Sequence, residues 1–224
     1  MATPTRPMAT ISLTFDNGPE PGVTDVVLDT LASRDVRAAF FVVGSKLERD
    51  AGLRCARRAA GEGHRVGNHT YSHREPLGLL DPEASRAEIA RTQELLDGFV
   101  TERLFRPIGG AGQEGELGDQ LLSPAARDLL IAEGFTVVLW NVVPRDWEQP
   151  HGWVDVALER CRQTDHAIVV LHDIPGGAMA HLPAFLDRAI DEGAHFTSDF
   201  PPSCVVLERG VPRGALDAYV RATA

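Results

Sequence analysis

Two histidines four residues apart, His69 and His73, are the side chains whose types and spacing point most directly to chemistry. Neutral imidazole is a common ligand of zinc and other divalent metals, and two imidazoles at this spacing can point at one ion. The pair follows a short extended segment at residues 63–68 that ends in a turn, and functional side chains often lie on loops held by a rigid scaffold. Alone, the pair is equally compatible with two solvated loop histidines, so its interpretation depends on the rest of the chain.

Four further polar fragments follow segments that we expect to be strands. They are Asp16-Asn17, Arg106, Asp146-Trp147 and His172-Asp173. In a parallel α/β fold the carboxyl ends of the strands meet at one edge of the sheet, where functional residues gather. We therefore expect these fragments and the histidine pair to line one pocket, which a set of unrelated loop residues and helix caps would not do.

The elements that must position these residues alternate along the chain. Short β-branched or aromatic segments predict strands at residues 10–15, 38–43, 63–68, 103–105, 136–140, 167–171 and 205–207. Amphipathic segments predict helices at residues 23–33, 53–60, 81–96, 123–133, 154–162 and 182–191. Strands that are apolar throughout and separated by helices imply a parallel sheet covered by helices. We expect a single-domain α/β fold, a distorted (β/α) barrel with about seven parallel strands, with a doubly wound open sheet as the alternative.

No repeat, linker or change in composition divides the chain. We expect an N-terminal extension at residues 1–9, one domain at residues 10–208 and a C-terminal tail at residues 209–224. An apolar fraction of 43% supports a substantial core. The three cysteines are widely spaced and form neither a disulfide framework nor a thiolate metal site, so each is expected to be a small buried side chain.

The charge and hydropathy of the chain narrow its partners. A formal net charge of -10 argues against nucleic acid or an anionic membrane surface as a partner, because both require basic patches. No apolar run approaches the length of a membrane span, and the first residues have no apolar segment like that of a signal peptide. These observations predict a cytoplasmic protein, and they leave its oligomeric state open.

Taken in order, the five fragments resemble the motifs of the polysaccharide deacetylases, the NodB-like carbohydrate esterases of family four. The matching fragments are Thr14-Phe15-Asp16-Asn17-Gly18-Pro19, His69-Thr70-Tyr71-Ser72-His73, Phe105-Arg106-Pro107-Ile108-Gly109-Gly110, Asp146-Trp147 and Leu171-His172-Asp173. The resemblance covers roughly residues 10–208, and the set of five is far more specific than any single fragment.

The resemblance implies an acid and a base. Asp16 would be the base that deprotonates the attacking water, and Arg106 would hold Asp16 in place. His172 would be the acid that protonates the departing amine, and Asp146 would orient His172. Hydrolysis of an amide needs such a pair, because water is a weak nucleophile and an amine is a poor leaving group.

The resemblance also implies a divalent metal, expected to be zinc, held by His69, His73 and the residue at position 17. The family has an aspartate there, whereas this chain has Asn17. An amide oxygen is neutral and a weaker ligand than a carboxylate, so we expect weak metal binding. Three interpretations remain open: a weak or water-completed site, a site that uses no metal, and an asparagine that is engineered or that deamidates to aspartate next to Gly18.

Other residues are expected to bind substrate. They are Trp147, Ile108, Gly109 and Leu171, and the backbone N–H groups near Ile108 or Gly109 could form an oxyanion hole. Trp140 and Trp153 could also stack on a sugar, although core packing is the stronger expectation for Trp140. Two departures from the family pattern are Val143, where an aspartate is usual, and Ile108-Gly109, where Pro-Tyr or Pro-Phe is usual. The glycine-rich segment at residues 110–118 is equally compatible with a lid and with an ordinary surface loop.

The leading hypothesis is a hydrolase of non-peptide C–N bonds that removes acetyl groups from an N-acetylated sugar or oligosaccharide by metal-assisted attack of water. A metal-independent amidohydrolase acting on a small cyclic amide or ureide is the first alternative. An inactive relative that only binds carbohydrate is the second, and the complete acid and base set argues against it.

Overall fold

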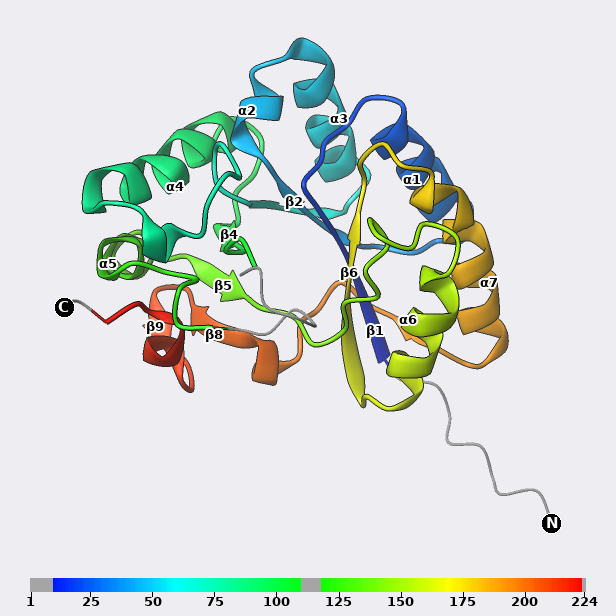
Figure 1. Cartoon of the computed structure of the whole chain (residues 1–224). Coiled ribbons are helices and arrows are strands. Elements are labelled where there is room, and N and C mark those ends of the chain that lie inside the picture. Colours follow the sequence, from blue (N-terminus) through cyan, green and yellow to red (C-terminus); the bar gives the residue numbers. More distant parts are fainter. Residues whose placement is uncertain (1–9, 110–117, 223–224) are drawn as a thin grey trace.

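The structure is a computed structural model that describes residues 10–109 and 118–222. It consists of one curled sheet with helices around its outer side (Figure 1). The strands are β1 (Thr10–Asp16), β2 (Ala39–Val42), β3 (Arg65–Asn68), β4 (Leu104–Phe105), β5 (Thr136–Val138), β6 (His166–His172), β7 (His195–Phe196), β8 (Val205–Glu208) and β9 (Val211–Pro212). The α-helices are α1 (Val23–Ala32), α2 (Gly44–Leu47), α3 (Asp50–Gly61), α4 (Pro82–Leu96), α5 (Pro124–Ala132), α6 (Trp153–Arg162) and α7 (Leu182–Asp191). Short 3-10 helices are η1 (Leu77–Leu79), η3 (Ala178–His181), η4 (Pro202–Cys204) and η5 (Leu216–Tyr219).

The sheet forms a distorted barrel. Its strands follow the order β6-β1-β2-β3-β4-β5, each parallel to its neighbour, and β7 pairs in parallel with the start of β1. The segment after β5 returns to β6 through a parallel bridge between Val142 and Val169. In this bridge Val142 donates to the carbonyl of Ile168 at 3.1 Å, and Val170 donates to that of Val142 at 2.9 Å. The barrel is therefore confirmed, and the alternative of a doubly wound open sheet is wrong.

The last part of the sheet differs from the prediction in direction. The strand expected near Val205 exists as β8, but it runs antiparallel to β5, and β9 continues antiparallel to β8. The seventh parallel strand is β7, which the sequence did not reveal. Residues 197–204 join β7 to β8 with only the turn of η4 between them, whereas a parallel return needs a crossover of about a dozen residues or more. The boundary at residue 208 stays a prediction.

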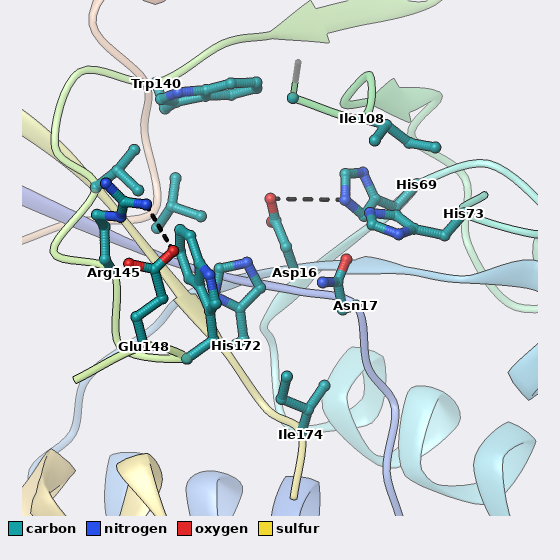
Figure 2. A pocket seen from close by; sticks show the side chains of 14 residues that line it. Asp16, Asn17, His69, His73, Ile108, Trp140, Arg145, Glu148, His172 and Ile174 are labelled. Carbon is teal, nitrogen blue, oxygen red and sulfur yellow. Dashed lines mark hydrogen bonds and ion pairs between the residues drawn. The ribbon is translucent and has the colours of Figure 1, made fainter. Parts of the chain in front are cut away.

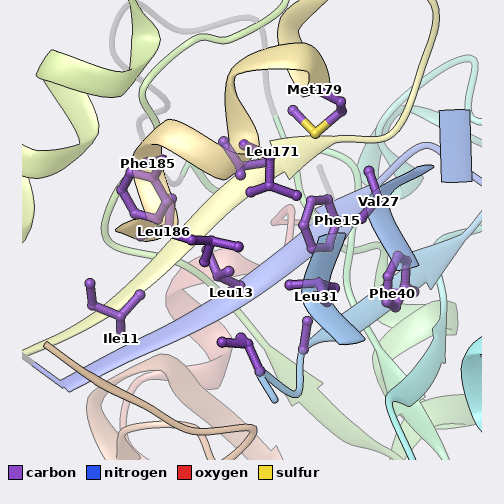
Figure 3. Close-up of a cluster of buried hydrophobic side chains, with 14 of the residues drawn as sticks. Ile11, Leu13, Phe15, Val27, Leu31, Phe40, Leu171, Met179, Phe185 and Leu186 are labelled. Atoms are coloured by element: carbon purple, nitrogen blue, oxygen red, sulfur yellow. The ribbon is translucent and has the colours of Figure 1, made fainter. Parts of the chain in front are cut away.

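Strand β1 shows how alternation along a strand separates the core from the site. Ile11, Leu13 and Phe15 point outward and pack against α1 and α7, as Figure 3 shows. The polar residues between them, Ser12, Thr14 and Asp16, are 0%, 0% and 4% exposed and point to the other face of the sheet. The strand thus brings a hydroxyl and a carboxyl into the interior of the barrel.

Two helices begin as their sequences predict. The Asp81 carboxylate accepts hydrogen bonds from Glu83 and Ala84 at the start of α4, directly before Pro82. Ser123 caps α5 in the same way, before Pro124.

All three cysteines are buried and form no disulfide, as expected. Within residues 10–109 and 118–222, no helix is both long and apolar enough to cross a membrane, and the cytoplasmic location stays a prediction.

Candidate active site

A cavity of about 500 Å³ opens at the carboxyl ends of the strands (Figure 2). It is lined by Asp16, Asn17, His69, His73, Ile108, Gly109, Trp140, Val143, Arg145, Trp147, Glu148, Val170, His172 and Ile174. Polar groups from the first, second and fifth sequence fragments thus meet in one place. The remaining two fragments contribute Arg106 and Asp146, which lie behind the lining and hold it.

Asp16 is held by a fully buried arginine. The Arg106 guanidinium donates to Asp16 Oδ1 at 2.9 Å and to Thr14 Oγ1 at 2.7 Å. It also donates to the carbonyls of Val138 and Leu139, at 3.2 and 3.3 Å. Burial lowers the pKa of Arg106, and the adjacent Asp16 carboxylate opposes this effect. The second carboxylate oxygen of Asp16 remains turned towards the pocket.

The same arginine also orients a histidine. His69 Nδ1 donates to the backbone carbonyl of Arg106 at 2.8 Å, which leaves Nε2 as the nitrogen with a lone pair. That Nε2 lies 3.8 Å from Asp16 Oδ2. The side chain and the main chain of Arg106 therefore hold two different residues of the pocket.

A second charged pair lies across the cavity. His172 Nδ1 is 2.8 Å from Asp146 Oδ1, and the His172 backbone N–H donates to Asp146 Oδ2 at 2.9 Å. Trp147 packs edge-on against the His172 ring, with centroids 4.7 Å apart. Burial, the largest single effect, lowers the pKa of His172, but the hydrogen bond and charge of Asp146 and the charges of Asp16 and Asp173 together raise it by more, so the pKa of His172 is raised. The imidazole thus tends to keep a proton, with Nε2 as the end that Asp146 leaves available.

The histidine pair and Asn17 fit a divalent metal. The rings of His69 and His73 lie with centroids 4.7 Å apart, and burial lowers the pKa of each to about 3, so both are neutral. Asn17 Oδ1 is buried and accepts no hydrogen bond from the described residues. In the described part of the chain, no three His, Cys, Asp or Glu side chains are grouped to hold a metal. Any metal here would thus rely on two imidazoles and one amide oxygen.

The predicted substrate-binding residues divide into two groups. Ile108, Gly109 and Trp147 line the cavity, and Trp147 is 46% exposed. Leu171 is fully buried in the hydrophobic core instead, because neighbouring residues of β6 point to opposite faces and Val170 takes the place at the cavity.

The other aromatic residues follow the same division. Trp140 is 9% exposed and lines the cavity. Trp153 is fully buried and donates from its indole to the carbonyl of Ala178, so it does not reach the site. The segment suggested as a lid lies outside the described residues, apart from Gly118.

Several lining residues were missed by the sequence reasoning. Arg145 and Glu148 form an ion pair of 2.6 Å at the cavity, and Ile174 follows β6. Arg145 and Glu148 flank the predicted Asp146-Trp147 pair, so their proximity to that motif was the available signal. Arg145 also has a φ of 58°, an uncommon conformation for a residue with a side chain.

Comparison with known proteins places the chain in a family. The polysaccharide deacetylase family model matches residues 3–117. A chitooligosaccharide deacetylase of Rhizobium leguminosarum bv. trifolii is 37% identical over 165 residues, which cover 73% of this chain and 71% of that protein. The peptidoglycan-N-acetylglucosamine deacetylase PgdA of Listeria monocytogenes serotype 1/2a is 30% identical over 191 residues, or 84% of this chain.

The fold comparison agrees. A family 4 acetyl xylan esterase from Clostridium thermocellum, in complex with a cobalt ion, is 26% identical and superposes with a TM-score of 0.67 over 84% of this chain and 87% of that one. The chain belongs to the polysaccharide deacetylase family. It spans only 37% of the length of PgdA.

Proposed function

We propose that this protein hydrolyses the acetamide bond of an N-acetylated amino sugar or oligosaccharide and releases acetate. The observation that carries the proposal is that one cavity contains a carboxylate paired with an arginine and an imidazole paired with an aspartate. Asp16 is held by a buried arginine, and His172 is held by a buried aspartate. One group is prepared to accept a proton and the other to donate one, which is what amide hydrolysis by water requires.

Asp16 is the proposed base. Arg106 occupies Oδ1, so Oδ2 is the oxygen that takes the proton from a water molecule in the pocket. Because Arg106 is fully buried and bonded on several sides, it keeps the carboxylate in one orientation as the water is deprotonated.

His172 is the proposed acid. Its Nδ1 faces Asp146, so Nε2 carries the proton that passes to the departing amine nitrogen. Asp146 stabilises the imidazolium before the transfer and fixes the plane of the ring. The raised pKa of His172 supports this role, because the donor must hold its proton near neutral pH.

His69, His73 and Asn17 are the proposed ligands of a divalent metal, for which we propose zinc. When bound, the ion would polarise the acetyl carbonyl and lower the pKa of a water molecule. The cobalt ion of the Clostridium thermocellum esterase supports the proposal of a divalent metal. The neutral Asn17 amide in place of a carboxylate favours a second candidate, a metal-independent hydrolase of a small cyclic amide.

The other walls of the cavity suit an acetylated sugar. The backbone N–H groups of Ile108 and Gly109 are the proposed donors to the developing oxyanion. Apolar side chains of Ile108 and Trp140 provide a surface for the acetyl methyl group. The half-exposed Trp147 provides a ring on which a sugar can stack. The similarity to a chitooligosaccharide deacetylase and to a peptidoglycan-N-acetylglucosamine deacetylase supports the same class of substrate.

Acetate release tests the proposal. Purified protein is supplied with zinc or cobalt and with chito-oligosaccharides, and acetate is measured alongside the metal content of the protein. We expect release that stops on chelation and that falls by about 100-fold or more in Asp16→Asn and His172→Ala, since each removes one proton-transfer group. An absence of release with either metal would contradict deacetylation. Release that survives complete metal removal would contradict the metal requirement and favour the second candidate's metal-independent chemistry.

A further inference from the structure

The loop between the two histidines has a conformation that must be held from outside. Thr70 and His73 have φ values of 66° and 50°, in the left-handed region. This region is uncommon for residues other than glycine and is unfavourable for a β-branched residue such as threonine. Such conformations persist where surrounding contacts define them.

One carboxylate oxygen provides those contacts on the outer side of the loop. Glu88, on α4, accepts hydrogen bonds at Oε2 from the backbone N–H groups of Tyr71, at 2.9 Å, and Ser72, at 2.8 Å. On the other side, the N–H groups of Gly44 and Ser45 donate to the carbonyls of Thr70 and Tyr71, both at 2.9 Å. The loop is thus fixed between the start of α2 and the side of α4.

The two histidines depend on this loop to different degrees. His69 has its own anchor, since its ring donates to the carbonyl of Arg106. Within the described residues, the His73 ring has no hydrogen bond to a side chain or backbone group of another residue, and it packs against the His69 ring. The place of the His73 nitrogen is therefore set by the path of the backbone through residues 70–72.

We propose that Glu88 is a positioning residue for His73, acting through the backbone of Tyr71 and Ser72. A carboxylate in this role offers a strong acceptor to two N–H groups that point the same way. The consequence for metal binding rests on the proposed function, whereas the consequence for the loop itself does not.

Three variants separate the hydrogen bonds from the charge. Glu88→Ala removes the acceptor and the charge, and Glu88→Gln removes the charge but keeps an acceptor oxygen. Glu94→Ala is the matched control, because Glu94 is an exposed glutamate on the same helix. Thermal unfolding of each variant reports whether the fold as a whole is retained.

The first readout needs no metal. Hydrogen exchange of the Tyr71 and Ser72 amides is measured in the metal-free proteins. We expect exchange at least about tenfold faster in Glu88→Ala, since opening of the loop then exposes both N–H groups, and near-normal exchange in Glu88→Gln and Glu94→Ala. Equal protection in Glu88→Ala and the unaltered protein would overturn the proposal.

The second readout is the dissociation constant of zinc, from competition with a chelator. We expect binding weaker by about 10–100-fold in Glu88→Ala, the usual effect of losing a residue that supports a ligand, and largely restored binding in Glu88→Gln. A Glu88→Gln protein as weak as Glu88→Ala would overturn the proposal in favour of a simple charge effect. If the unaltered protein binds no zinc, the metal part of the proposed function fails, and hydrogen exchange still decides the role of Glu88.

Discussion

Asp16 and His172 reach the same cavity with different electrostatic surroundings. The carboxylate of Asp16 has a guanidinium beside it, and the imidazole of His172 has a carboxylate beside it. Each partner places the opposite charge beside its neighbour, and beside the imidazole this charge raises the pKa of His172. Both partners are buried, which keeps these effects from being screened by salt.

Removing the Asp146 charge should change the titration of His172. In Asp146→Asn, burial, which is already the largest single effect on the His172 pKa, loses the effect that mainly opposes it, so we expect this pKa to fall from its raised value to below the ordinary ~6.5. In the unaltered protein the raised pKa of His172 contributes to the stability of the fold. This contribution is complete at pH values below the unfolded pKa of ~6.5, and it is lost as the pH rises through the higher folded pKa. NMR titration of the imidazole C–H signals measures both proteins. Asp155→Asn, an exposed aspartate on α6, is the control, and an unchanged pKa in Asp146→Asn would contradict the assignment.

Asn17 determines the charge of the proposed metal site. Asn17→Asp would place a carboxylate where a buried amide oxygen now has no partner among the described residues. We expect zinc to bind at least about tenfold more tightly, because a carboxylate is a stronger ligand than a neutral amide. Loss of a residue that only supports a ligand already changes metal affinity by about 10–100-fold. Isothermal titration with zinc measures the difference, with His73→Ala as the weakened control. Equal affinities for the two proteins would show that position 17 is not a ligand.

At the scale of elements, the ends of β1 and β6 are packed together without space for a side chain. A Cβ on Gly18 would lie 2.2 Å from both carboxylate oxygens of Asp173, the residue after His172. Asp173 is fixed in turn by Thr24 of α1, whose hydroxyl donates to Oδ2, and burial raises the pKa of Asp173 to about 7. The segment after β1, which contains Asn17, therefore packs directly against Asp173 at the end of β6.

Gly18→Ala should disturb that contact. We expect a loss of about 1–3 kcal/mol in the free energy of unfolding, the usual effect of overpacking a buried position. Urea unfolding measures it, and Gly98→Ala is the matched control, because a Cβ at Gly98 meets nothing within 4 Å. If both variants unfold at the same urea concentration as the unaltered protein, the contact is not as tight as the structure indicates.

Most elements could be predicted because their patterns are local. Apolar residues that alternate with polar ones mark β1, apolar runs mark β2 and β6, and the proline-containing starts of α4 and α5 are visible in the sequence. The two residues of β7 are too few to show a period, and the direction of β8 depends on which strand it meets. The motif residues around the cavity could be predicted through the family resemblance, whereas the contact of Glu88 with the histidine loop arises only when α4 packs beside it.

The molecule as a whole carries a formal net charge of -10. Arg145, an arginine at the cavity wall, is already paired with Glu148. A substrate that carries carboxylates would therefore approach against a repulsive field, whereas a neutral oligosaccharide would not.

Ionic strength should separate these two kinds of substrate. For neutral chito-oligosaccharides we expect a KM that changes little with salt. For the same oligosaccharides carrying carboxylates we expect a KM several-fold higher at low salt, falling as the Debye length shortens to about 10 Å at 0.1 M. Acetate release at a series of sodium chloride concentrations measures both. Parallel salt dependence for the two substrates would mean that the overall charge has no part in selection.

The double attachment at Arg106 has a consequence for motion. Its carbonyl holds His69 and its guanidinium holds Asp16, so any displacement of the end of β4 carries both residues in the same direction. We therefore expect thermal motion of the barrel to shift this part of the cavity as one body and to change the 3.8 Å separation between His69 Nε2 and Asp16 Oδ2 little. Relaxation-dispersion signals from the two residues are expected to share one exchange rate, since a single collective movement would displace both.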